Sequence, residues 1–124
     1  MITFFSPENK YSKFVRKLNK TYNANDKSTA ASLIFCKAYN YLLSKKRYDL
    51  LSDLIMTHLP KMTDKAILYN KITIEKVNQA CSALELAGFN ANVIALYDFF
   101  NQKESAVEFF AKKSNVDDLI IYIT

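Results

Sequence analysis

Residues 73–100 read TIEKVNQACSALELAGFNANVIALYDFF, and this stretch decides the fold. Thr73 is a good N-cap, and apolar side chains then recur every three or four residues, as on one face of a helix. Gly88, the only glycine of the chain, follows the last of them. The residue after a helix commonly takes a positive φ, which glycine adopts without strain, and Phe89 is placed to contact Leu84 as in a Schellman motif. The stretch therefore predicts a helix that ends at Gly88.

The helical pattern resumes directly after this turn. Asn90 is a residue type that caps helices, and the apolar residues that follow it predict a second helix to about Phe100. Asn101 and Glu104 then have the spacing of a capping box for a third helix, which ends near Lys113. The second half of the chain is thus expected to alternate short helices with tight turns.

The first half repeats this organisation. Ser6 and Pro7 are typical of a helix N-cap and first position, and an apolar stripe continues from there to Tyr22. The further predicted helices cover residues 26–46, capped by Asp26 or Ser28, residues 48–59, stopped by Pro60, and residues 63–69, opened by Thr63 or Asp64.

Composition agrees with a folded, loop-poor chain. The sequence has 124 residues, of which 50% are hydrophobic, and only one glycine and two prolines. This length supports a single core, so we expect one domain over residues 1–124. The predicted fold is all-α, with six to eight short helices arranged as antiparallel hairpins in a solenoid-like array or an irregular bundle.

The two chain ends allow two interpretations. Residues 116–124 could form a last helix, which is the preferred prediction, but their β-branched residues could also form a strand that pairs with residues 2–5. An isolated two-stranded ribbon is marginal unless helices pack against it, which favours the helix.

Basic residues are concentrated in the first half. Residues 1–61 contain 11 Lys and Arg against 4 acids, a net charge of +7, whereas residues 62–124 contain 6 against 8, a net charge of −2. Fifteen of the 17 basic residues are lysines. Lysine lacks the planar fork with which arginine reads base edges, so sequence-specific DNA binding is disfavoured.

The candidate binding residues form a ridge and a corner. The ridge recurs every three or four residues on one side of the first helix, and the corner follows the second helix. They are Lys10, Lys13, Lys17 and Lys20 in the ridge, and Lys45, Lys46 and Arg47 at the corner. The alternative is that these residues are only a solvated face in a lysine-rich sequence.

Tyrosines accompany these lysines along the chain. Six of the eight tyrosines fall among the basic residues: Tyr11, Tyr22, Tyr39, Tyr41, Tyr48 and Tyr69. If exposed, tyrosine beside lysine can stack on bases while the ammonium contacts phosphate, but the same pair is common in protein interfaces. We prefer the protein interface.

Catalytic and metal-binding patterns are not found in the sequence. The only histidine, His58, is expected at the C-terminal end of a helix, where an imidazole commonly satisfies carbonyl groups. Cys36 and Cys81 have no second ligand at metal-binding spacing and are expected to be buried free thiols. The acids, such as Glu104 and Glu108, have the spacing of a solvated helix face. We therefore expect no enzyme, no cofactor and no metal site.

These features predict a non-catalytic protein-binding module that occupies the surface of a partner protein, as immunity proteins, antitoxin-like inhibitors, chaperones and adaptors do. The partner is expected to have an acidic surface and to be encoded nearby. The alternative is an accessory protein that binds nucleic acid without sequence preference through the basic half. No apolar run is long enough to cross a bilayer and no export signal is recognisable, so we expect a cytoplasmic protein with no membrane partner.

Overall fold

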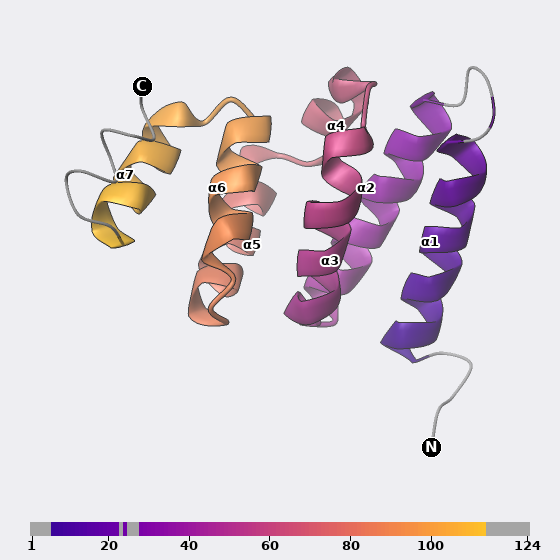
Figure 1. Ribbon diagram of the computed structural model, residues 1–124, viewed down its shortest axis with the longest axis horizontal. Helices are drawn as coiled ribbons and strands as arrows, with labels where there is room; N and C mark the ends of the chain where they lie inside the picture. The colour runs from indigo at the N-terminus through magenta and orange to yellow at the C-terminus, as the bar shows by residue number, and fades with distance from the viewer. Residues whose placement is uncertain (1–5, 23, 25–27, 114–124) are drawn as a thin grey trace.

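A computed structural model describes residues 6–22, 24 and 28–113 (Figure 1). Seven α-helices and one short 3₁₀ helix lie in these ranges. They are α1 (Pro7–Tyr22), α2 (Ser28–Ser44), α3 (Tyr48–His58), η1 (Leu59–Lys61), α4 (Lys65–Lys71), α5 (Ile74–Leu86), α6 (Asn90–Phe99) and α7 (Lys103–Lys113). The all-α prediction is confirmed. The prediction for residues 116–124 and their pairing with residues 2–5 lies outside the described residues.

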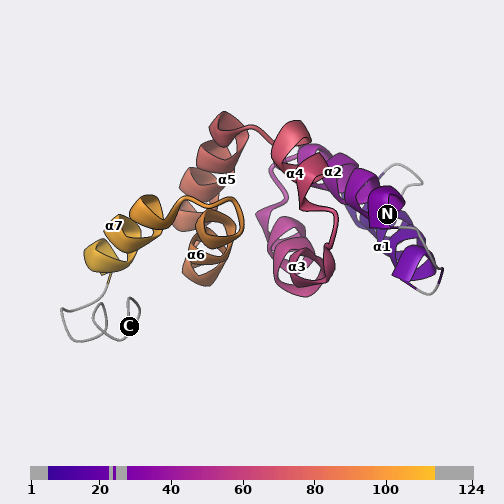
Figure 2. The same cartoon turned by 90° about the horizontal axis from the view of Figure 1, so that it is seen from above.

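The helices form a row of antiparallel hairpins, with α1 at one end and α7 at the other (Figures 1 and 2). Helix α1 packs on α2, α2 pairs with α3, and the short α4 also packs against α2. Helix α3 then contacts the next hairpin, formed by α5 and α6, and α7 packs on α6. Most contacts are thus made between elements that are adjacent in the row, and α1 and α7 lie at its two ends.

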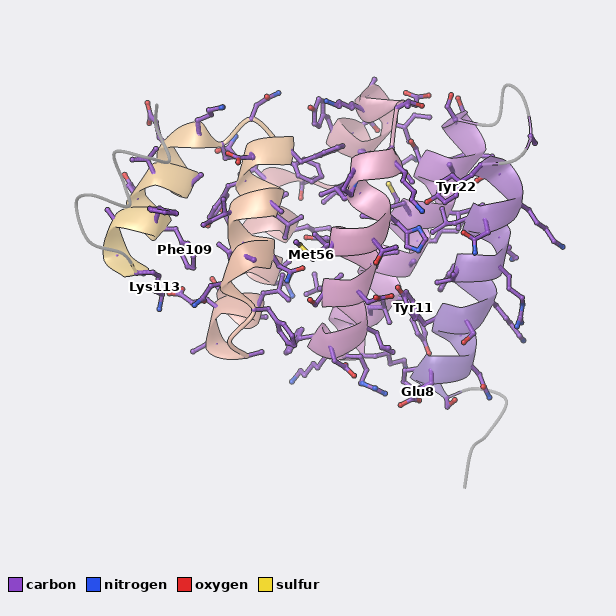
Figure 3. The ribbon with its side chains drawn as sticks, viewed as in Figure 1. Glu8, Tyr11, Tyr22, Met56, Phe109 and Lys113 are labelled. Carbon is purple, nitrogen blue, oxygen red and sulfur yellow. The ribbon has the colours of Figure 1, made fainter. Side chains whose placement is uncertain are left out.

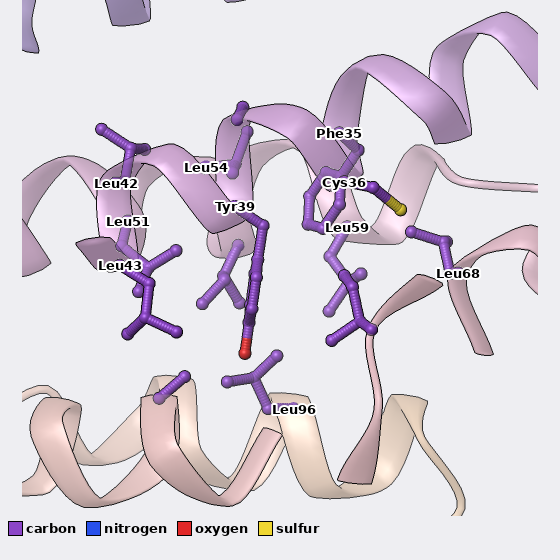
Figure 4. Packing of buried hydrophobic residues seen from close by; sticks show 14 of the residues in the cluster. Phe35, Cys36, Tyr39, Leu42, Leu43, Leu51, Leu54, Leu59, Leu68 and Leu96 are labelled. Carbon is purple, nitrogen blue, oxygen red and sulfur yellow. The ribbon is translucent and has the colours of Figure 1, made fainter. Parts of the chain in front are cut away.

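One continuous apolar core runs through both hairpins (Figure 4). Tyr39 is fully buried at its centre and donates a hydrogen bond from its hydroxyl to the carbonyl of Lys76 (3.0 Å), which joins α2 to α5. Leu54, Leu84 and Phe100 are all buried, as their helical spacing predicts.

Both cysteines are buried and unpaired, as expected from their apolar surroundings. Burial raises the pKa of the Cys36 thiol to about 11 and that of the Cys81 thiol to about 12. Each thiol therefore stays protonated near neutral pH and packs as a small apolar side chain.

Three helices end in the same backbone motif, which was predicted for only one of them. The amide of Phe89 donates to the carbonyl of Leu84 (2.8 Å), and Gly88 has a φ of +90°. This is the predicted Schellman motif. Lys46 (φ 58°) ends α2 and Asn101 (φ 60°) ends α6 with the same pair of backbone hydrogen bonds. Asn101 therefore closes α6, and the prediction that it caps α7 is wrong.

One further boundary prediction is wrong. Asn90 is the first residue of α6 and does not cap it; Phe89 occupies the N-cap position without a side-chain hydrogen bond, because the turn closed by Gly88 leads directly into the next helix. The prediction that Pro60 stops the helix that begins at Tyr48 is confirmed: α3 ends at His58, and Pro60 lies in the first turn of η1, where its missing N–H costs no hydrogen bond. The caps at Ser6 and Thr73 are confirmed by hydrogen bonds to the amides of Asn9 and Lys76.

Substitutions at two of the left-handed turns are expected to change the free energy of unfolding in opposite directions. A methyl group at Gly88 would meet no atom within 4 Å, so the Gly88→Ala variant changes only the backbone energy and should lose about 1–2 kcal/mol of unfolding free energy. Lys46→Gly relieves a left-handed lysine and should instead gain up to about 1 kcal/mol. Urea denaturation of both variants measures the two effects. If both variants changed the free energy of unfolding in the same direction, these turns would not hold their left-handed conformation in solution.

Candidate functional site

The predicted ridge lies on the solvent side of α1. Its four lysines, Lys10, Lys13, Lys17 and Lys20, are all exposed. Arg16 is exposed in the same row and was missed, although its spacing from Lys13 and Lys20 follows the same helical period. The ridge therefore contains five cations along a helix about 24 Å long.

The apolar side of α1 determines where this ridge faces. Tyr11, Phe14 and Leu18 are buried against the rest of the protein, and the Phe14 ring packs at 6.1 Å from the Tyr41 ring of α2. The apolar and the basic residues lie on opposite sides of one helix, so burial of the apolar side places the cations on the solvent side.

Among the described residues, no carboxylate pairs with the lysines of the ridge. Glu8 is the only acid of α1, and α2 has none. Within the ranges that the structure describes, Lys13, Arg16, Lys17 and Lys20 form no ion pair. An exposed face of one charge without internal counterions attracts an oppositely charged partner and accelerates its association.

The structure divides the predicted corner into two parts. Arg47 forms ion pairs with Glu8 of α1 and with Asp49 of α3 (2.9 Å to Asp49), so it joins the start of α1 to the start of α3. The hydrogen bonds from the guanidinium lower the pKa values of Glu8 and Asp49. Arg47 thus has carboxylate partners within the protein and is the least available of the predicted residues.

Lys45 and Lys46 remain exposed at this corner. The ammonium groups of Lys45 and Lys10 lie 5.9 Å and 6.0 Å from the centre of the Tyr41 ring, and cation–π attraction favours both positions. Tyr41 therefore connects the corner to the N-terminal end of the ridge. We call the ridge together with Lys45 and Lys46 the basic face.

The tyrosines of the basic half are mostly used inside the fold. Tyr11 and Tyr39 are buried, Tyr22 and Tyr48 are half-buried, and Tyr41 is covered by the two lysines. Tyr69 is exposed, but it lies on α4 and packs on Phe99 and Phe100. Base stacking beside the ridge lysines, one basis of the nucleic-acid alternative, therefore has no exposed ring to use among these six tyrosines.

Two tyrosines of α1 attach it to α3 (Figure 3). Tyr11 donates a hydrogen bond to the carboxylate of Asp53, 42 residues away, and the Tyr22 hydroxyl lies 2.7 Å from Nδ1 of His58. His58 is buried, as the structural interpretation expects, but its partner is this hydroxyl and not a helix carbonyl. The basic face is thus held in place by polar contacts at both ends of α1.

The burial of His58 predicts a pH dependence of stability. Burial, with repulsion from Lys61, holds the pKa of His58 below its ordinary 6.5, while Asp53 opposes this weakly. As the pH falls through 6.5, the unfolded chain therefore takes up the proton first, and the folded state loses stability. The loss should begin below pH 6.5 and continue as the pH falls through the lowered pKa of His58.

The measurement is thermal unfolding at a series of pH values between 5 and 8. His58→Gln keeps a neutral hydrogen-bonding group near Tyr22 and should flatten the curve in this range. A slope that the substitution leaves unchanged would assign the effect to another group.

A cavity of about 220 Å³ lies between α5, α6 and α7. Its lining includes Cys81, Tyr97, Glu85 and Phe109, and Lys113 reaches Glu85 from α7 at 3.4 Å (Figure 3). Burial raises the pKa values of both Cys81 and Tyr97 to about 12, which makes neither a nucleophile at neutral pH. In the part of the chain that the structure describes, no cluster of His, Cys, Asp and Glu could hold a metal ion.

The acidic residues that were expected to form a solvated helix face lie on the surface. Glu104 and Glu108 are exposed on α7, which agrees with a solvated face. No helix in the described ranges is long and apolar enough to span a membrane.

Comparison with known proteins gives no match to any protein family, any curated protein or any solved structure. The functional argument therefore depends on the chemistry of the basic face.

Proposed function

We propose that this chain is a non-catalytic helical module that binds an acidic surface of a protein partner through its basic face. The observation that carries the proposal is the row of exposed cations on α1, which have no carboxylate partner among the described residues. Such a module acts by covering the partner's surface, as an immunity protein, an antitoxin-like inhibitor, a chaperone or an adaptor does.

The rigidity of α1 supports this role. The helix is fixed to α2 by its apolar stripe and to α3 by the hydrogen bonds of Tyr11 and Tyr22. Binding therefore costs little ordering of the backbone, and the entropy lost is mainly that of lysine side chains. A helix of this length and its neighbouring turn can supply a large part of the ~800 Å² that a standard interface buries on each partner.

The placement of the tyrosines favours a protein partner over nucleic acid. Binding of single strands without sequence preference typically combines cations with exposed aromatic rings, and Tyr11, Tyr22 and Tyr41 are occupied by internal contacts. Phosphate contacts by the lysines alone remain the second candidate.

The proposed setting is the cytoplasm. Cys36 and Cys81 are both buried free thiols, which is usual for proteins of a reducing compartment. We further propose that the partner is encoded by a neighbouring gene, as is common for inhibitors and chaperones.

Affinity capture from native lysate, with and without nuclease, tests the proposed function. We expect the tagged chain to recover one acidic protein in stoichiometric amount, regardless of nuclease treatment. Recovery of nucleic acid alone would contradict the proposal.

A titration with a mixed-sequence oligonucleotide tests the second candidate directly. If its affinity falls between ~50 and ~200 mM salt with a log–log slope of several units, the basic face binds phosphates. We expect no such binding at the lower salt concentration.

A further inference from the structure

The turn between α2 and α3 and the turn between α5 and α6 lie at the same edge of the row of helices. Helices α3 and α6 both begin at this edge: the side-chain amide of Asn92, near the start of α6, donates to the Ser52 hydroxyl, near the start of α3 (2.9 Å). The turn at residues 45–47, and the end of α5 with the turn that follows it at residues 86–89, therefore lie at the same edge. Both lie along the lower edge in Figure 1.

The two turns have different surfaces. The turn before α3 presents Lys45 and Lys46 to solvent. The turn before α6 is free of charge over residues 86–91, and Leu86 protrudes from it with 91% of its surface exposed. By comparison, Leu84 of the same helix is fully buried.

The exposure of Leu86 is not required by the fold. Three turns of this protein close with the same backbone hydrogen bonds, and the apolar contact of the Schellman motif is available to Phe89, which is half-buried. Leu86 takes no part in those hydrogen bonds, so its surface is available to a partner.

We propose that this edge docks a protein surface on which an apolar pocket is bordered by carboxylates, with Leu86 entering the pocket and Lys45 and Lys46 facing the carboxylates. The inference rests on the proposed function, because these two lysines belong to the basic face and the partner is the same. It adds an apolar anchor, which the basic face itself lacks. Interfaces draw most of their affinity from such a buried anchor, while surrounding charges set the association rate and orientation.

A lipid surface fits these residues less well. Of the large apolar side chains in the described residues, only that of Leu86 is more than half exposed, and it is far shorter than a single acyl chain, which by itself gives only marginal membrane binding. A protein pocket, in contrast, can surround one leucine on several sides.

A benzophenone amino acid placed at position 86 of the full chain is the probe. The matched control carries it at Met56, which is 49% exposed and lies about 12 Å along α3 from the start of that helix. On irradiation in native lysate, we expect position 86 to crosslink to the protein captured through the basic face, and position 56 to give no crosslink. The crosslinked peptide should contain apolar residues flanked by Asp or Glu.

Affinity for that purified protein then measures the anchor. Leu86→Ser should weaken binding by about tenfold or more, whereas Met56→Ser should change it less than about twofold. Both side chains are exposed, so thermal unfolding of the two variants should match the parent chain.

The other outcomes would each overturn the inference, and they distinguish its failure from a failure of the proposed function. If a protein is captured but position 86 does not crosslink and Leu86→Ser binds normally, the proposed function stands and this inference fails. If no protein is captured, both fail. Sedimentation with vesicles containing phosphatidylglycerol that requires Leu86 would assign the edge to a membrane surface.

Discussion

Replacing Leu84 by alanine is expected to lower the free energy of unfolding by about 2–5 kcal/mol, the largest effect on stability that we predict here. Leu84 is completely buried in the apolar core that joins the two hairpins. The substitution removes buried methyl groups and leaves a cavity that the surrounding helices can close only in part. Urea denaturation, with the slope of the transition compared as well as its midpoint, measures the loss.

The same helix supplies the control. Leu86 lies two residues further along α5 and is 91% exposed, so Leu86→Ala makes the same chemical change without creating a cavity. It should alter the unfolding free energy by less than about 0.5 kcal/mol. Equal midpoints for the two variants would mean that the assigned inner and outer sides of α5 are wrong.

Local sequence predicted the helices well because their signals are local. The caps at Ser6 and Thr73 act on amides three residues later, and Gly88 is the one residue type that takes a positive φ without strain. Each signal and its effect lie within one turn of helix, so no knowledge of the tertiary structure is needed.

The wrong boundaries involve residues that suit two positions. Asparagine caps helices but also tolerates the left-handed conformation, and Asn101 takes the second option at the end of α6, whose last residue, Phe99, lies two residues before it. Lys46 gave no signal at all, since lysine does not favour a positive φ.

The sequence predicted which side of α1 the basic residues occupy, but not which basic residues pair with carboxylates of the protein itself. The spacing of Lys13, Lys17 and Lys20 placed them on one side of α1, and the same rule should have included Arg16. The pairing of Arg47 with Glu8 spans 39 residues and depends on how α1 lies against the α2–α3 turn. No local pattern reveals that contact, so the corner looked more available than it is.

The apolar anchor was missed for a related reason. Leu84 and Leu86 are chemically identical and lie only two residues apart in the sequence. Only the direction in which α5 faces its neighbours distinguishes the buried leucine from the exposed one. Sequence periodicity does place Leu84 inside, but it does not show that Leu86 protrudes from an uncharged turn beside two lysines.

Reversing two charges of the ridge, in the double variant Lys13→Glu and Lys17→Glu, is expected to have the largest effect on binding. Both side chains are exposed, and the buried residues Tyr11, Phe14 and Leu18 are untouched. The unfolding free energy should therefore change by less than about 1 kcal/mol. The association rate with an acidic partner should fall by about tenfold or more at low salt, because attraction at long range becomes repulsion.

Stopped-flow association at several salt concentrations measures this effect, and its salt dependence separates the two candidate functions. For a protein partner, the difference between the variant and the parent chain should shrink as salt screens the charges, while the dissociation rate changes little. Uniform loss of affinity for every oligonucleotide sequence would instead indicate phosphate contacts. The conservative control, Lys13→Arg with Lys17→Arg, keeps the charge and should bind like the parent chain. An unchanged association rate in the reversed variant would show that the ridge is only solvated, and the interface would then have to involve other surfaces, such as Glu104 and Glu108 of α7.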